Sequence, residues 1–104
     1  WCVPCREEMP HFIRMQSAYG AQGLTFVGIA IDKPDRVQRF ANEIGVNYPL
    51  LVGDISDFSL ARNAGNVADV LPYTIVLDRQ GNIVARRAGL YSEQTLTPIV
   101  KGLL

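Results

Sequence analysis

Apolar residues recur at helical spacing in the first half of the chain. The segment from Cys5 to Tyr19 places them roughly on one face of a helix, and Gly20 and Gly23 follow as stop signals. A second helix is predicted to begin at Pro34, because proline suits a first helical position. Its apolar residues follow an i, i+3, i+4, i+7 pattern, at Val37, Phe40, Ala41 and Ile44.

Runs of apolar and β-branched residues lie between and after these helices. Residues 24–31 are almost wholly apolar, which is typical of an interior parallel strand covered on both faces. Residues 48–52 predict a further extended segment. Residues 73–78 and 82–87 predict two short strands, and the linking segment that ends at Gly81 suits an antiparallel hairpin.

The C-terminal segment predicts a last helix with one apolar face, formed by Leu96, Ile99, Val100, Leu103 and Leu104. Pro98 suits this helix only near its first turn. A short helix is predicted over residues 57–63. The chain shows no repeats or linkers, so residues 1–104 are expected to form one α/β domain.

The predicted order of elements implies a missing strand. A parallel strand reached through a helix needs an earlier strand to complete a right-handed βαβ unit, and no residues before Cys5 supply it. We therefore expect an α/β sandwich that lacks its first central strand. The chain would then be an N-terminal truncation, or its sequence would omit upstream residues.

Composition and charge narrow the function only slightly. Of the 104 residues, 48% are hydrophobic and 19% charged, which is ordinary for one globular domain. Ten basic residues balance ten acidic ones. This balance, without basic runs, argues against nucleic acid or an anionic membrane surface as the partner.

The pair Cys2 and Cys5 carries the most specific signal. Residues three apart on a helix lie close enough for a disulfide. A disulfide that closes so short a loop removes little entropy from the unfolded chain, so a purely structural role explains the pair poorly. Cys2 falls at or near the start of a helix, where free N–H groups and the helix dipole stabilise a thiolate. We therefore predict that Cys2 is the nucleophile and that Cys5, expected to be more buried, is the resolving thiol.

Other chemistry-bearing residues are interpreted more simply. Zinc sites use the same C-x-x-C spacing but need four ligands, and His11 is the only other soft ligand. We therefore predict no metal and no organic cofactor. His11 is expected to face solvent, and Arg86 and Arg87 are interpreted as a solvated charged patch.

The first ten residues, WCVPCREEMP, resemble the active-site signature W-C-x-x-C-R-x-E-x-P of the TlpA/ResA-like branch of the thioredoxin superfamily. The similarity extends more loosely over the rest of the chain. It implies a thioredoxin-like three-layer sandwich, with a mixed central sheet and helices on both faces. It also implies a thiol:disulfide oxidoreductase that acts on proteins through the two cysteines.

The resemblance implies roles for residues around this pair. The proline at position 72 would be cis, pack against the redox pair and let the backbone of Leu71 pair with the substrate chain. Trp1 would shield the disulfide and form part of the docking surface, together with Val3 and Pro4.

Glu8 matches a family glutamate placed one turn after the second cysteine. The resemblance implies that this residue influences proton transfer and substrate choice. A carboxylate near the thiols would raise a thiol pKa and could relay the proton of the resolving thiol. The alternative is a solvated glutamate on the helix face.

The resemblance further implies an extracytoplasmic reductase in cytochrome c maturation or oxidase copper-site assembly, exported or anchored through a segment upstream of Trp1. Its partners would be protein disulfides or dithiols and an upstream electron donor. Two other functions stay open. A thiol peroxidase shares the fold, but its signature has Thr or Ser three residues before a single reactive cysteine. A copper-binding assembly factor uses a distant histidine, and none follows His11.

Overall fold

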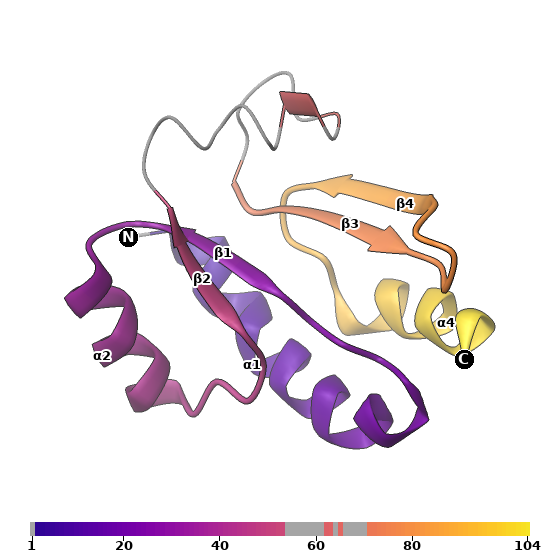
Figure 1. The fold of residues 1–104 in the computed structure, drawn as a ribbon, viewed down its shortest axis with the longest axis horizontal. Helices are drawn as coiled ribbons and strands as arrows, with labels where there is room; N and C mark the ends of the chain where they lie inside the picture. Colours follow the sequence, from indigo (N-terminus) through magenta and orange to yellow (C-terminus); the bar gives the residue numbers. More distant parts are fainter. Residues whose placement is uncertain (1, 54–61, 64, 66–70) are drawn as a thin grey trace.

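The structure, a computed structural model, describes residues 2–53, 62–63, 65 and 71–104 (Figure 1). Its elements, in order, are α1 (Val3–Tyr19), the short 3-10 helix η1 (Gly20–Gln22), β1 (Gly28–Ile31), α2 (Pro34–Ile44), β2 (Leu50–Gly53), β3 (Tyr73–Leu77), β4 (Ile83–Ala88) and α4 (Glu93–Leu103). Of the predicted helix over residues 57–63, only the last two positions lie within the described residues. Trp1 lies outside them.

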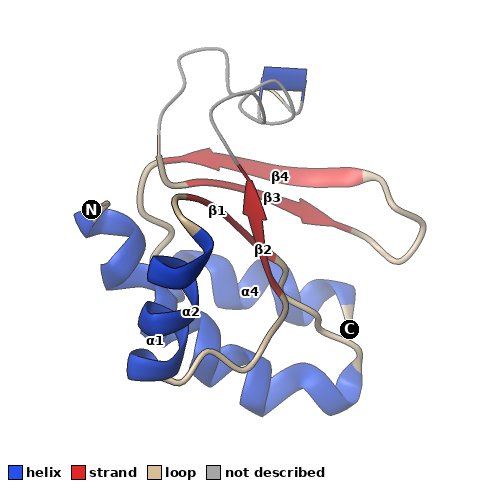
Figure 2. Ribbon diagram, turned by 60° about the vertical axis from the view of Figure 1, so that its left-hand side comes forward, coloured by secondary structure: helices blue, strands red, loops and turns tan. Residues whose placement is uncertain are grey.

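The hydrophobic core lies between α1 and α4. Phe12 and Met15 of α1 pack with Leu96 and Val100 of α4 and with Tyr91, which precedes α4. Figure 2 shows both helices below the strands. In Figure 1, α2 lies near β2 and well away from α4. The helix that begins at the cysteines is thus held in place by core residues in its middle.

The strands form two pairs. β1 and β2 are parallel, with Gly28 opposite Leu50, and β3 and β4 are antiparallel, with Tyr73 opposite Ala88. Both the predicted parallel strand and the predicted hairpin are therefore confirmed. In the described part of the chain no strand precedes α1, and no hydrogen-bonded strand joins β1 to β3. This is the arrangement expected of a sandwich without its first central strand.

β1 is shorter and more exposed than the sequence predicted. It begins at Gly28 because the side chain of Gln16 binds the backbone of the preceding residues. Gln16 Nε2 donates to the carbonyl oxygen of Leu24 at 2.9 Å, and the N–H of Phe26 donates to Gln16 Oε1 at 2.8 Å. The expectation of cover on both faces is wrong, since Val27 and Ile29 are each 57% exposed. Within the described residues β1 pairs with β2 alone.

Gln16→Ala is expected to lower the free energy of unfolding by about 1–2 kcal/mol, because two backbone groups lose their partner. Gln38→Ala is the matched control. Gln38 is exposed on α2, and among the described residues its side chain bonds Asn42, four residues later, so its loss should cost under about 0.5 kcal/mol. Urea denaturation of the two variants checks the difference, and equal losses would contradict this account of the segment before β1.

α4 begins earlier than Pro98 suggested. Ser92 is its N-cap, and the hydroxyl oxygen of Ser92 accepts a hydrogen bond from the N–H of Thr95 at 3.2 Å. The prediction that Pro98 lies near the first turn is therefore wrong, because the serine cap fixes the start of the helix. None of the described helices is long and apolar enough to span a bilayer.

Candidate active site

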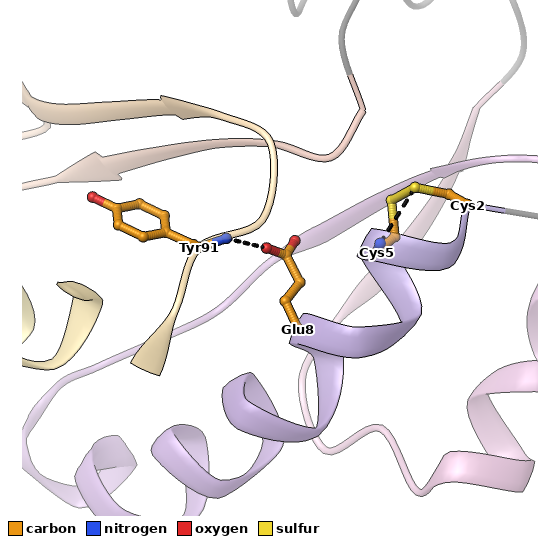
Figure 3. The surroundings of a disulfide bond; sticks show 4 residues. All are labelled: Cys2, Cys5, Glu8 and Tyr91. Atoms are coloured by element: carbon orange, nitrogen blue, oxygen red, sulfur yellow. Dashed lines mark hydrogen bonds between the residues drawn. A yellow bond between two sulfur atoms is a disulfide. The ribbon is translucent and has the colours of Figure 1, made fainter. Parts of the chain in front are cut away.

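Cys2 and Cys5 are joined by a disulfide across the first turn of α1 (Figure 3). Their Cα atoms lie 5.3 Å apart, as helical spacing allows. Pro4 lies in the first turn, where a missing N–H costs nothing because first-turn donors have no partner within the helix. Both cysteines are half-buried, so the structure does not distinguish Cys5 as the more buried of the two.

Cys2 is the N-cap of α1. Its backbone is extended, and its Sγ accepts a hydrogen bond from the N–H of Cys5 at 3.3 Å. The sulfur thus occupies the place that a serine or aspartate oxygen takes at many helix starts. In the dithiol form, this N–H and the positive end of the helix dipole favour the Cys2 thiolate.

The predicted docking residues lie in different settings. Val3 is 61% exposed, and Pro4 is exposed beside it. Leu71 is half-buried and Pro72 is buried. The peptide bond between them is cis, as the resemblance implied. Trp1, the remaining predicted docking residue, lies outside the described residues.

Glu8 is buried on α1, with 4% of its surface exposed. Glu8 lies one helical turn after Cys5, and Figure 3 shows its carboxylate directed toward Tyr91. The backbone N–H of Tyr91 donates to Glu8 Oε2 at 2.9 Å. The alternative of a solvated glutamate on the helix face is therefore wrong, because the turn before α4 covers this side chain.

Burial changes the proton affinity of Glu8. Removal from water raises the pKa of Glu8 from 4.5 to about 7, although the hydrogen bond from Tyr91 opposes the rise. The charge of Glu8 also reaches Tyr48. Burial is the larger cause and the negative charge of Glu8 the smaller one, and together they raise the pKa of Tyr48 to about 12. Near neutral pH, Glu8 is thus able to hold or release a proton one turn from Cys5.

The sequence held a signal for the burial of Glu8. Phe12 and Met15 follow it by four and seven residues, so all three share one face of α1 and all three are buried. The partner, Tyr91, carried no such signal, because 83 residues separate it from Glu8.

His11 is half-buried, not solvent-facing as expected. Its Nδ1 atom is buried and has no hydrogen-bond partner in the described part of the structure. No group of three or more His, Cys, Asp or Glu side chains within that part could hold a metal ion. In the oxidised form, the two sulfurs bond to each other.

Comparison with known proteins places this site in a family. A model of the AhpC/TSA family matches residues 1–86. The chain belongs to this family. The chain is also similar to the "Thiol-disulfide oxidoreductase ResA" of Halalkalibacterium halodurans, with 32% identity over 100 residues. It is 35% identical over 105 residues to the "Thiol:disulfide interchange protein HelX" of Rhodobacter capsulatus.

These two matches confirm the ResA/TlpA-like resemblance. They cover 90% and 100% of this chain but only 52% and 56% of the two relatives, so the chain spans about half their length. A thiol:disulfide interchange protein of the thioredoxin family from Chlorobium tepidum TLS has a similar solved structure. The TM-score is 0.84 at 29% identity, over 99% of this chain and 72% of that one. The thioredoxin-like fold predicted from the sequence is thereby confirmed.

Proposed function

We propose that this chain catalyses thiol–disulfide exchange on protein substrates through Cys2 and Cys5. The observation that carries the proposal is the disulfide across the first turn of α1, with Cys2 as the helix N-cap. Membership of the AhpC/TSA family and similarity to proteins named for disulfide interchange support it. No organic cofactor or metal takes part in this reaction.

In the reductive direction, the Cys2 thiolate attacks one sulfur of a substrate disulfide. The substrate S–S bond breaks, and the leaving sulfur takes up a proton. Cys5 then loses its proton and attacks the Cys2 sulfur, which breaks the mixed disulfide and frees the second substrate thiol. Two electrons pass to the substrate, and the Cys2–Cys5 disulfide is the product. An upstream dithiol donor restores both thiols by the reverse exchange.

Glu8 acts in the second step of this scheme. It lies one turn after Cys5 on α1, and burial brings its pKa to about 7. A carboxyl group of this pKa is populated in both forms near neutral pH, which suits a group that takes the proton of one thiol and passes it on. The buried setting also shields the exchanged proton from bulk water.

Substrate binding uses the surface around the cysteines. The exposed Val3 and Pro4 contact the substrate chain beside the redox pair, together with Trp1. The backbone of Leu71, ahead of Pro72, pairs with the substrate in an extended conformation. The family resemblance supports these assignments.

The setting is extracytoplasmic, and the substrates are proteins of cytochrome c maturation or oxidase copper-site assembly. The resemblance to ResA/TlpA-like proteins supports this setting.

The activity is tested with the reduced chain and insulin, a protein with accessible disulfides. Exchange predicts one oxidised Cys2–Cys5 pair for each insulin disulfide reduced, counted by thiol titration and mass spectrometry. Hydrogen peroxide is the control oxidant. Rapid consumption of peroxide without any reaction with insulin would favour a thiol peroxidase. Tight binding of copper by the reduced chain, without exchange, would favour an assembly factor.

The pathway is tested by trapping. Cys5→Ser removes the resolving thiol, so substrates remain bonded to Cys2 and can be identified by mass spectrometry. Cytochrome c or copper-site proteins attached to Cys2 are the expected result. Attachment of unrelated proteins alone would reject the proposed pathway while leaving the exchange activity intact.

A further inference from the structure

The turn between β4 and α4 contains the group that binds Glu8. The N–H of Tyr91 is the hydrogen-bond donor that the described residues supply to the Glu8 carboxylate. Tyr91 is almost fully buried, with 3% of its surface exposed, and belongs to the core cluster. The position of this N–H therefore depends on how the turn itself is held.

Arg87 holds the other end of the same peptide group. Its Nε donates to the carbonyl oxygen of Leu90 at 2.7 Å. The carbonyl of Leu90 and the N–H of Tyr91 belong to one peptide bond, which is planar and, in its trans form, directs the two groups oppositely. Arg87 and Glu8 thus bind opposite ends of one rigid unit. The guanidinium also lies over the Tyr91 ring, 5.8 Å from its centroid.

Gly89 forms the turn between Arg87 and Leu90. Its φ of +94° lies in the left-handed region, which lets the chain turn between Arg87 and Leu90. Its N–H donates to the carbonyl oxygen of Pro72 at 2.8 Å. The turn is therefore fixed from two sides, by the Arg87 side chain and by the segment that contains Pro72.

We propose that Arg87 is a positioning residue for Glu8, and that it acts through the Leu90–Tyr91 peptide group. The guanidinium fixes and polarises this peptide, so that its N–H stays directed at the carboxylate. A role of Arg87 in catalysis rests on the proposed function, thiol–disulfide exchange. The effect of Arg87 on the pKa of Glu8 does not depend on that function. The sequence predicted a solvated patch at Arg86 and Arg87, and it did not predict that Arg87 binds the carbonyl of Leu90.

Other titratable groups lie near Glu8 along α1 or interact with its charge. Cys5 lies one turn earlier on α1 and His11 one turn later. Tyr48 precedes β2, and the negative charge of Glu8 contributes to its raised pKa. None of these groups is altered by a change at Arg87, so the contribution of the Arg87 contact can be measured separately.

Arg87→Met removes the donor and the charge from an exposed side chain. A weakened bond from Tyr91 stabilises the carboxylate less, so the pKa of Glu8 is expected to rise by about 0.5 to 1 pH unit. The measurement is a carbon-13 NMR titration of the Glu8 carboxyl in the oxidised protein. A general loss of stability alone would not move this titration.

Two controls separate the contact from its alternatives. Arg86→Met removes the same charge one residue earlier, and Arg79→Met removes a similar guanidinium bond, from Arg79 to the carbonyl of Gln22 at 3.1 Å. Neither is expected to move the Glu8 titration by more than about 0.2 pH unit. An unchanged titration in Arg87→Met, or an equal shift in Arg86→Met, would overturn the proposal.

The pH profile of insulin reduction is measured on the same Arg87→Met variant. A profile that moves with the carboxyl titration supports both Arg87 as a positioning residue and Glu8 as a participant in exchange. A carboxyl that moves while the profile stays fixed supports the positioning of Glu8 by Arg87 and rejects the part proposed for Glu8 in exchange.

Discussion

Cys2→Ser is expected to abolish thiol–disulfide exchange, because a serine hydroxyl forms no bond with a substrate sulfur and does not ionise near neutral pH. The fold should be preserved. Serine is a favoured N-cap residue, and its oxygen can accept the hydrogen bond from the N–H of Cys5 that the Cys2 sulfur now accepts. Loss of insulin reduction without loss of helical circular dichroism is the expected result.

Cys5→Ser is the matched variant with a different expected outcome. Its Cys2 still attacks the substrate, but no thiol remains to release the product. The variant should therefore accumulate an equimolar mixed disulfide, visible as a larger species on a non-reducing gel and removed by dithiothreitol. If Cys2→Ser traps substrate while Cys5→Ser traps none, the two roles are reversed.

Glu8→Gln is expected to remove most of the pH dependence of stability between pH 5 and 8. The pKa of Glu8 is raised from 4.5 to about 7 in the folded state. Between these two pKa values the folded protein keeps a proton on Glu8 that the unfolded chain has lost, so the free energy of unfolding falls as the pH rises. The full difference of about 2.5 pH units corresponds to about 3 kcal/mol.

Glutamine keeps the size of the side chain and an oxygen that can accept from Tyr91, but it carries no charge. At pH 8, Glu8→Gln should thus be more stable than the parent chain by up to about 3 kcal/mol. At pH 4.5 the two should be nearly equal. Urea denaturation of the oxidised proteins at several pH values checks this. Glu7→Gln, at an exposed neighbouring position, is the control. A parent-like slope in Glu8→Gln would contradict the burial of the charge.

The local part of the site could be predicted from the sequence. The contact between Cys2 and Cys5 depends on helical spacing and on Pro4 in the first turn, and all three lie within one helical turn. A helix start is determined by neighbouring residues, so the position of Cys2 as the N-cap could be predicted without knowledge of the fold.

The surroundings of Glu8 could not be predicted in the same way. Its pKa depends on burial and on the Tyr91 N–H, which a distant turn supplies. Nothing in the residue types around Tyr91 marks a backbone group as a carboxylate partner. The contact of Arg87 with Leu90 is local but depends on the left-handed backbone at Gly89.

The apolar segment at residues 24–31 shows a further limit. Its composition indicated a strand correctly, because β-branched and aromatic residues favour extended backbone. Composition does not identify neighbours, however. The Gln16 side chain binds the backbone at Leu24 and Phe26, and β1 pairs only with β2 in the described residues. The length and exposure of β1 therefore differed from the expectation.

Gly89 has a consequence for genetic screens of this protein. It carries no reactive group, yet its N–H binds the Pro72 carbonyl, and its turn leads to the amide that binds Glu8. Any other residue is strained at its backbone conformation. Inactivating mutations should therefore recur at this glycine as well as at the cysteines. Their effects would be pleiotropic, impairing substrate docking and proton transfer together.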